Sequence, residues 1–264
     1  MKIGFIGCGN MGGALAHAVM KTSQAEVYIS DFLQEKAEAF AKETGATATD
    51  NLTIAESCDF IFLAVKPANF PAIIEPLREA FSKNASSVIV TIAAGLSLEK
   101  VGSMVGDEHP IIRIMPNTPV LLGKGMITWC KNALVSGEDC EKFKEILAHA
   151  GRLDEIDEKL IDAASAVAGC GPAFVYMFIE ALSDGAVECG LPRDKAMTYA
   201  AEMLAGAAEM VLKTGKHPGQ LKDEVCSPGG STIEGVKALE DGKFRADTAS
   251  AVIAAFEKTK KLGK

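Results

Sequence analysis

Short apolar runs alternate with amphipathic stretches over the first half of the chain. Several of these runs are apolar nearly throughout, as expected of strands that are covered on both faces of a parallel sheet. Strands that alternate with helices in this way predict an α/β domain. The predicted strands are Lys2–Gly7, Glu26–Asp31, Phe60–Val65, Val88–Ala93, Ile111–Met115, Gly125–Lys131 and Arg152–Ile156.

The segments between these strands carry apolar residues at helical spacing. Gly45 follows one such segment, at the place where a left-handed helix cap is expected. The predicted helices are Met11–Lys21, Gln34–Thr44, Asn69–Phe81, Leu98–Val105 and Glu138–Ala150.

The strand pattern ends near Glu158, and the rest of the chain reads as helices rich in alanine, methionine and leucine. We therefore predict two domains, an α/β domain over residues 1–157 and an all-helical domain over residues 158–264. The only charged residues in the segment Ala196–Leu212 are Glu202 and Glu209. A helical domain of about 100 residues cannot easily bury such a face alone, so we expect a homodimer through this domain.

Composition and charge narrow the possible partners. The chain has 48% hydrophobic and 23% charged residues, as in ordinary globular proteins. Its net charge of −8 leaves no evident basic face for nucleic acid or an anionic membrane, and no signal peptide or membrane span is predicted. The seven cysteines stand singly, which predicts a cytoplasmic protein without a metal site. We expect a small-molecule partner.

A glycine-rich turn follows the first predicted strand and opens the first predicted helix. The pattern is GxGxxG, in the context in which this motif binds a dinucleotide. Its glycines permit a tight turn, close approach of a pyrophosphate and close packing of helix on strand. A tight strand–helix turn without a ligand is the alternative, but the context favours a dinucleotide. The residues assigned to this site are Gly7, Cys8, Gly9, Asn10, Met11 and Gly12.

Asp31 ends the second predicted strand. It lies close to the spacing of about 20 residues after the glycines at which an acid accepts hydrogen bonds from an adenosine ribose. No arginine stands beside it to hold the 2′-phosphate of NADPH, which favours NADH. A surface acid at a loop entrance would look the same, so both NADPH and NADH stay open as cofactors.

Distinctive turns follow three further predicted strands, at the edge where open parallel sheets bind their ligands. A lysine in Ala-Val-Lys-Pro is placed to meet an anion, although a solvated lysine is an equal alternative. Two alanines leave room for a flat nicotinamide ring, and an asparagine lies in the rigid turn Met-Pro-Asn-Thr-Pro. The candidate cofactor-binding residues in these turns are Ala64, Val65, Lys66, Pro67, Ala93, Ala94 and Asn117.

The helical half contains a turn that is suited to an anion. Its sequence, Ser-Pro-Gly-Gly-Ser-Thr from Ser227 to Thr232, precedes the apolar-periodic segment Ile233–Leu239. A helix that begins there combines free backbone amides with three hydroxyls, which together suit a carboxylate. A capped helix without a ligand is the alternative.

Few side chains near these sites can act as a general base, and among the histidines only His217 lies near the candidate turn. A hydroxy-acid dehydrogenase needs such a base to take the hydroxyl proton. A protonated imine needs far less help, because its positive charge already polarises the carbon for hydride attack. The residues therefore favour reduction of a small carboxylated imine.

Along essentially its whole length the chain resembles the pyrroline-5-carboxylate reductase family. The matching segments are IGFIGCGNMG, AVKP, MPNTP and, most specific of all, HPGQLKDEVCSPGGSTIEGV. The resemblance implies a Rossmann-type dinucleotide-binding domain over 1–157 and a helical substrate-binding and dimerisation domain over 158–264. It also implies hydride transfer from NADPH or NADH to the C=N bond of 1-pyrroline-5-carboxylate, which gives L-proline in the last step of proline biosynthesis. Members of this family often assemble dimers into larger rings.

The resemblance also implies roles for individual residues. The active site would lie at the dimer interface, with the Thr232 hydroxyl as the catalytic group bonded to the ring nitrogen. Asn51 would help to bind the adenosine end of the cofactor, and Ala64–Pro67 and Ala93–Ala94 would line the dinucleotide. Glu158 would face the cationic nitrogen, unless it is a plain surface acid. The implied substrate-binding residues are Ser227, Gly229, Gly230, Ser231, Thr232 and Glu158.

Three other functions share part of this pattern. A β-hydroxyacid dehydrogenase has the same domain order but needs a lysine in its central helix, and here none lies between Gly171 and Lys195. A reductase of another cyclic imine differs in ring-size preference. Ala168 and Cys170 replace two serines common in the family; this change is harmless if they only pack at a helix bend, but it alters substrate affinity or ring-size preference if they touch substrate. A dinucleotide sensor without turnover would not depend on the Thr232 hydroxyl.

Overall fold

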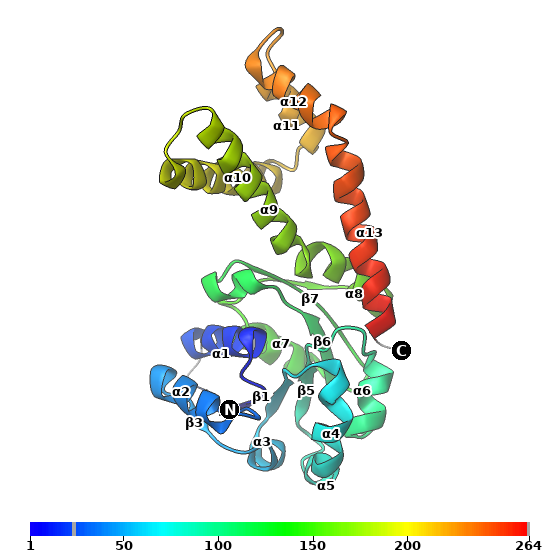
Figure 1. The fold of residues 1–264 in the computed structure, drawn as a ribbon. Coiled ribbons are helices and arrows are strands. Elements are labelled where there is room, and N and C mark those ends of the chain that lie inside the picture. Colours follow the sequence, from blue (N-terminus) through cyan, green and yellow to red (C-terminus); the bar gives the residue numbers. More distant parts are fainter. Residues whose placement is uncertain (23–24, 263–264) are drawn as a thin grey trace. The chain divides into compact units, whose positions relative to one another are not determined.

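Two compact units make up the chain in the computed structural model, which describes residues 1–22 and 25–262 (Figure 1). The first unit is Met1–Cys170 together with the C-terminal stretch that begins at Ala254, and the second is Gly171–Ile253. Contacts therefore divide the chain later than residue 157. The functional boundary between residues 157 and 158 stays a prediction.

An eight-stranded sheet with the order β3-β2-β1-β4-β5-β6-β7-β8 forms the centre of the first unit. Its neighbouring strands are parallel except for the antiparallel pair β6 and β7. The strand order reverses between β1 and β4, which is where Rossmann-type sheets bind dinucleotides. The strands are β1 (Lys2–Ile6), β2 (Glu26–Ser30), β3 (Thr47–Ala48), β4 (Phe60–Leu63), β5 (Val88–Thr91), β6 (Ile111–Met115), β7 (Gly125–Lys131) and β8 (Gly151–Glu155).

Helices cover both faces of this sheet and bury a separate apolar cluster on each. One cluster contains Phe5 and Phe62, whose rings stack with centroids 4.5 Å apart on neighbouring strands. The other contains Ile61 and Ile89, which point to the opposite face. The helices of this unit are α1 (Asn10–Thr22), α2 (Gln34–Thr44), α3 (Asn51–Ser57), α4 (Phe70–Ile74), α5 (Arg78–Lys83), α6 (Leu98–Val105), α7 (Gly137–Ile146) and α8 (Glu158–Ala164). The predicted α/β class is confirmed.

Most of the predicted elements are confirmed, and α2, α6, β6 and β7 have the predicted bounds. The sequence pattern missed β3 and α3, which have two and seven residues and are too short for a clear period. The segment Asn69–Phe81, for which helical spacing predicts a helix, is helical but is divided into two short helices. A 3₁₀ turn over Glu75–Leu77 separates α4 from α5, because Pro76 has no N–H to donate within a helix.

Helices joined by short loops form the second unit. Helices α9 and α10 pack against each other, and Ser183, Ala196 and Ala200 on them are buried. The predicted break between these helices is confirmed, with Gly190 at φ 95°. The helices are α9 (Gly171–Glu188), α10 (Arg193–Thr214), α11 (Pro218–Val225), α12 (Ser231–Asp241) and α13 (Phe244–Leu262), whose last part belongs to the first unit.

A π-helical turn over Ser165–Gly169 joins α8 to α9. The Cys170 N–H donates to the Ser165 carbonyl oxygen at 3.0 Å, which is the i+5→i hydrogen bond that defines a π-helical turn. The whole helical run Glu158–Glu188 has 31 residues. Its most apolar 18-residue window has a mean hydropathy of 1.4, and only 11% of that window is buried. By length and composition alone it is long enough to cross a membrane. An apolar helix that a second subunit covers has the same composition, so the expected absence of a membrane partner stays a prediction.

Candidate active site

The glycine-rich turn between β1 and α1 has the geometry that the GxGxxG motif predicts. Gly7 has φ 109°, and a Cβ there would lie 2.6 Å from the Ala64 carbonyl oxygen. A Cβ on Gly12 would lie 2.2 Å from the Gly7 carbonyl oxygen, so both positions require glycine. A Cβ on Gly9 would meet nothing within 4 Å, which leaves this backbone open to an approaching group. The first and third glycines therefore build the turn, and the second leaves space for a ligand.

Two of the predicted adenosine-binding residues lie near each other at the carboxyl end of β2. The Asp31 Oδ2 atom accepts a hydrogen bond of 2.7 Å from the Cys8 N–H, which fixes the carboxylate against the glycine-rich turn. The Ser30 hydroxyl donates to the Asn51 Oδ1 atom at 2.6 Å. Asn51 begins α3, whose N-cap Asp50 accepts from a backbone N–H, and this bond holds the pKa of Asp50 below its usual range. The structure thus brings Asp31 and Asn51 to the same end of β2.

The predicted residues after β4 and β5 lie at the same edge of the sheet. Lys66 is exposed, at the N-terminus of the 3₁₀ turn that Pro67 begins. Ala93 is buried, and its N–H donates to the Thr91 hydroxyl at 3.2 Å. Ala94 is half-buried, so this strand end offers a small, partly accessible surface. Their roles toward a cofactor stay predictions.

Asn117 is engaged by the protein itself. Its Nδ2 donates to the Ala168 carbonyl at 2.9 Å, and its Oδ1 accepts from the Met126 N–H at 3.0 Å. The side chain therefore ties the turn after β6 to the π-helical turn that contains Ala168. A role toward the cofactor, which stays a prediction, would involve the backbone of this turn more readily than the amide side chain.

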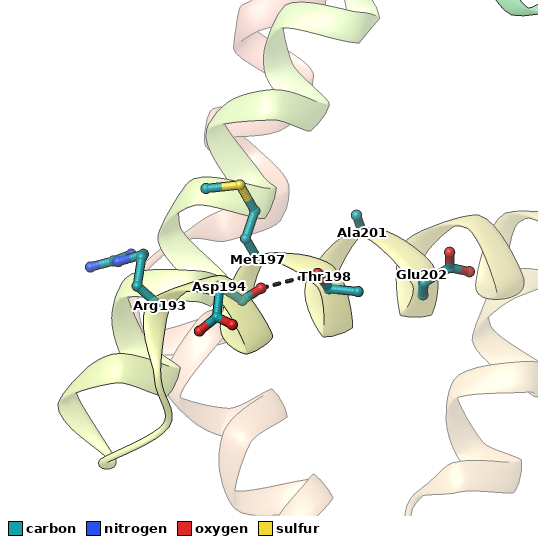
Figure 2. A pocket seen from close by; sticks show the side chains of 6 residues that line it. All are labelled: Arg193, Asp194, Met197, Thr198, Ala201 and Glu202. Atoms are coloured by element: carbon teal, nitrogen blue, oxygen red, sulfur yellow. Dashed lines mark hydrogen bonds between the residues drawn. The ribbon is translucent and has the colours of Figure 1, made fainter.

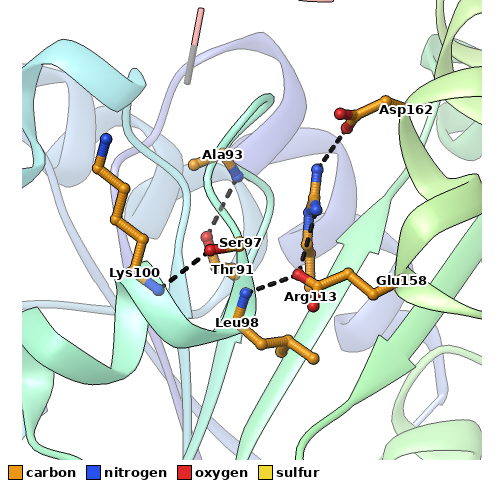
Figure 3. Close-up of polar contacts among 8 residues, drawn as sticks. All are labelled: Thr91, Ala93, Ser97, Leu98, Lys100, Arg113, Glu158 and Asp162. Carbon is orange, nitrogen blue, oxygen red and sulfur yellow. Dashed lines mark hydrogen bonds and ion pairs between the residues drawn. The ribbon is translucent and has the colours of Figure 1, made fainter. Parts of the chain in front are cut away.

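Sequence reasoning missed a buried cation at this edge of the sheet (Figure 3). The Arg113 side chain in β6 is 4% exposed. It donates to Glu158 Oε1 at 3.3 Å and to Asp162 Oδ1 at 2.6 Å, both on α8. Two carboxylates therefore compensate one buried charge and fix the start of α8 on the sheet. The signal was present in the sequence, because an arginine interrupts an otherwise apolar strand.

Glu158 has a second structural contact. Its Oε1 atom also accepts from the Leu98 N–H at 2.7 Å, at the N-terminus of α6 (Figure 3). The N-cap of that helix is Ser97, so the carboxylate adds a second acceptor to the same helix start. Its side chain is 34% exposed. The predicted contact of Glu158 with substrate stays a prediction beside this observed contact with α6 and Arg113.

The predicted substrate turn lies in the second unit, at the N-terminus of α12. Gly229 has φ 68°, which favours glycine. A Cβ on Gly230 would lie 2.4 Å from the Ser227 Oγ atom, so the turn is tight. Ser231 and Thr232 occupy the first turn of α12 and are exposed in the single chain. Unpaired amides of an 11-residue helix and hydroxyls that face solvent are the features that the carboxylate hypothesis requires.

The second unit also exposes apolar surface. A hollow of about 650 Å³ lies along one face of α10 (Figure 2). It is lined by Arg193, Asp194, Met197, Thr198, Ala201 and Glu202. All six residues belong to one helix, so the hollow is an uncovered helix face and not an enclosed cavity. Exposed large apolar side chains elsewhere in this unit are Val175, Tyr176, Met177, Tyr199, Met203, Met210, Leu212, Val225, Ile233, Leu239, Phe244 and Ile253.

Comparison with known proteins finds relatives over both units. Residues 158–262 match the family model for pyrroline-5-carboxylate reductase dimerisation, and residues 2–95 match the model described as NADP oxidoreductase, coenzyme F420-dependent. The pyrroline-5-carboxylate reductase of Escherichia coli (strain K12) is 41% identical, over 100% of this chain and 98% of that protein. The corresponding protein of Methanosarcina acetivorans is 36% identical, over 100% and 98%. The solved structure of Plasmodium falciparum pyrroline carboxylate reductase with NADP bound superposes with a TM-score of 0.91 and 36% identity, over 100% of this chain and 98% of that chain.

Proposed function

The chain belongs to the pyrroline-5-carboxylate reductase family, and we propose that it reduces 1-pyrroline-5-carboxylate to L-proline with NADH or NADPH, the last step of proline biosynthesis. The observation that carries this proposal is the full-length similarity, at 41% identity, to a reductase of that name. The geometry supports it independently. A dinucleotide-type turn in the first unit and a carboxylate-type helix start in the second are the two half-sites that such a reaction needs.

The first unit supplies the cofactor half-site. The glycine turn and the N-terminus of α1 suit a pyrophosphate, because backbone amides point out of the turn at a helix start. Asp31 and Asn51 would bind the adenosine ribose, which their hydrogen bonds to Cys8 and Ser30 at the end of β2 support. The small residues Ala93 and Ala94 would leave room for a flat ring. When bound, the nicotinamide supplies the hydride.

The second unit supplies the substrate half-site. The amides and hydroxyls of Ser227–Thr232 would hold the substrate carboxylate. The Thr232 hydroxyl would then bond the ring nitrogen, orient the imine and supply or hold its proton. Because the imine is protonated, no strong general base is required. This assignment agrees with the absence of a histidine among the residues of the turn.

A homodimer through the helical unit would complete this site. The exposed apolar side chains of the second unit and the match to a dimerisation domain support this part of the proposal. The cofactor of one subunit would then meet the substrate turn of its partner. Such dimers would assemble further into larger rings, as the resemblance to this family implies. We expect light scattering to give a dimer or a multiple of it. A stable monomer at micromolar concentration would contradict a site built between subunits.

At this interface a partner subunit, and not lipid, would cover the apolar run Glu158–Glu188. We place the protein in the cytoplasm, with a small-molecule substrate and without nucleic-acid or membrane partners. The net charge of −8 supports the absence of polyanionic partners. Expression without detergent should give the protein in the supernatant after ultracentrifugation, whereas recovery only with the membrane pellet would contradict this localisation.

The decisive experiment follows oxidation of NADH and of NADPH by absorbance, with 1-pyrroline-5-carboxylate and its six-membered homologue as parallel substrates. Turnover that depends on the five-membered ring supports the proposal. Faster turnover of the six-membered ring would instead assign a different cyclic imine as the substrate. Cofactor binding without turnover on either ring would favour a dinucleotide sensor.

A further inference from the structure

The carboxylate of Asp31 is held in place by the protein at the end of β2. Its Oδ2 atom accepts from the Cys8 N–H at 2.7 Å, and its Oδ1 atom accepts from the Leu33 N–H at 3.0 Å. One bond ties it to the glycine turn and the other to the turn before α2. Each oxygen retains a second lone pair for a hydroxyl donor. The acid is therefore fixed where Rossmann-type domains bind the adenosine ribose, before any ligand arrives.

The surroundings of this carboxylate are poor in cations. The residues that follow it are Phe32, Leu33, Gln34 and Glu35, all exposed, and two of them are apolar while one is acidic. No arginine occurs before Arg78 in the sequence. Lys36 is the nearby cation, since it lowers the pKa of the Cys8 thiol while burial and Asp31 raise it. A 2′-phosphate, with a charge of about −1.5 to −2, would meet one fixed carboxylate and one flexible lysine.

We infer that the chain selects NADH over NADPH, and that Asp31 is the residue that determines this selection. In NADH, the 2′- and 3′-hydroxyls of the adenosine ribose can both donate to the fixed carboxylate. A phosphate at the 2′ position has no proton to donate in that place and is repelled by the same charge. The inference rests on the proposed function only in that the ligand is a nicotinamide dinucleotide. It also implies a difference from the Plasmodium falciparum relative, whose solved structure has NADP bound.

The test measures binding without substrate, so that its outcome does not depend on turnover. Dissociation constants for NADH and NADPH are measured by calorimetry on the intact protein and on Asp31→Asn. In the parent we expect NADH to bind at least about tenfold more tightly than NADPH. In the variant we expect the ratio of the NADPH dissociation constant to the NADH dissociation constant to fall by about tenfold. The ratio is informative because both cofactors use the same glycine turn, and any loosening of that turn affects both alike.

The matched control is Glu26→Gln, which removes the same charge from the opposite end of the same strand. Its ratio should equal that of the parent, because screening weakens charge effects beyond about 10 Å. A salt series on the parent gives a test that needs no variant. If Asp31 repels the 2′-phosphate, raising the salt concentration from about 0.05 to about 0.5 M should bring the dissociation constants of NADPH and NADH closer together, because salt screens the repulsion.

Two outcomes would overturn the inference. The first is equal or tighter binding of NADPH by the parent, with the ratio moving further toward NADH as salt rises, which would show that Lys36 binds the phosphate. The second is an NADH preference that Asp31→Asn leaves unchanged. Selective binding without reduction of any imine would leave the inference intact and remove the proposed function, so the two failures are distinguishable.

Discussion

Replacement of Arg113 by methionine tests the ion-pair network that fixes α8 on the sheet. The guanidinium is 4% exposed and bonds Glu158 and Asp162 at 3.3 and 2.6 Å. Methionine keeps most of the volume and removes the charge. Two carboxylates, 34% and 27% exposed, then remain close together without a cation, and Glu158 still accepts from the Leu98 N–H.

The expected cost follows from the burial of each partner. Breaking a fully buried pair costs about 3–5 kcal/mol, because the group left behind is an uncompensated charge. Here the groups left behind are about one-third exposed and can recover water, and the Nε atom of Arg113, which has no partner, is removed as well. We therefore expect Arg113→Met to lower the free energy of unfolding by about 2–3 kcal/mol. Asp162→Asn leaves the cation with one carboxylate and should cost about 1–2 kcal/mol.

Urea unfolding followed by tryptophan fluorescence measures the free energy of unfolding with a probe close to Arg113. Trp129 is the single tryptophan, it is buried in β7, and it pairs with Ile114 beside Arg113. The control is Lys142→Met, which removes an exposed i,i+4 ion pair on α7 and should leave the urea midpoint of unfolding close to that of the parent, because exposed ion pairs contribute little to stability. A change in the free energy of unfolding below about 0.5 kcal/mol for Arg113→Met would refute the reasoning, since it would mean that desolvation of the arginine costs as much as its two ion pairs contribute.

Three further predictions follow from local geometry. Gly9→Ala should leave the melting temperature unchanged but weaken dinucleotide binding about tenfold or more, because its Cβ meets no protein atom and occupies the ligand's space; Gly12→Ala should lower the melting temperature, because its Cβ would lie 2.2 Å from a carbonyl oxygen. Thr232→Ala should reduce kcat by about 100-fold with an unchanged cofactor dissociation constant, with Thr232→Ser as the control that restores the hydroxyl, and equal turnover of the alanine variant and the parent would remove the mechanism. Burial raises the pKa of Cys58 to about 11 and that of Cys130 to about 12, from an ordinary value of 9.0. At pH 8 roughly one thiol in a thousand or fewer is then ionised, so iodoacetamide should modify both cysteines in urea but neither in the native protein, as read by mass spectrometry.

The fold could be predicted to a large extent because hydrophobic periodicity reports burial. The strands β6 and β7 are apolar runs between turns, and their bounds follow from the pattern alone. Helix α2 was bounded by Gly45, whose φ of 83° is the left-handed cap that its sequence position predicts. The two-residue strand β3 carries no period at all, and its pairing with β2 depends on the sheet that is already formed.

The site could be predicted where a motif fixes a backbone shape, and not where contacts cross the sequence. The glycine turn and the start of α12 are local shapes that their glycines dictate. The partners of Arg113 are 45 and 49 residues away, so no spacing rule predicts them. The same holds for Asn117, whose amide bonds the Ala168 carbonyl 51 residues later, where sequence reasoning had expected a cofactor contact.

The two half-sites differ in how complete they are in a single chain, and this difference bears on why the family pattern includes a dimerisation domain. The glycine turn is already braced by Asp31, and two of its three glycines are closely packed. The turn Ser227–Thr232 is mostly exposed in the single chain. Hydride transfer to an imine benefits from a dry site, because water weakens every electrostatic contact to the substrate. We therefore expect one chain to be sufficient for binding of the dinucleotide, and catalysis to require a second surface that closes over the proposed substrate turn.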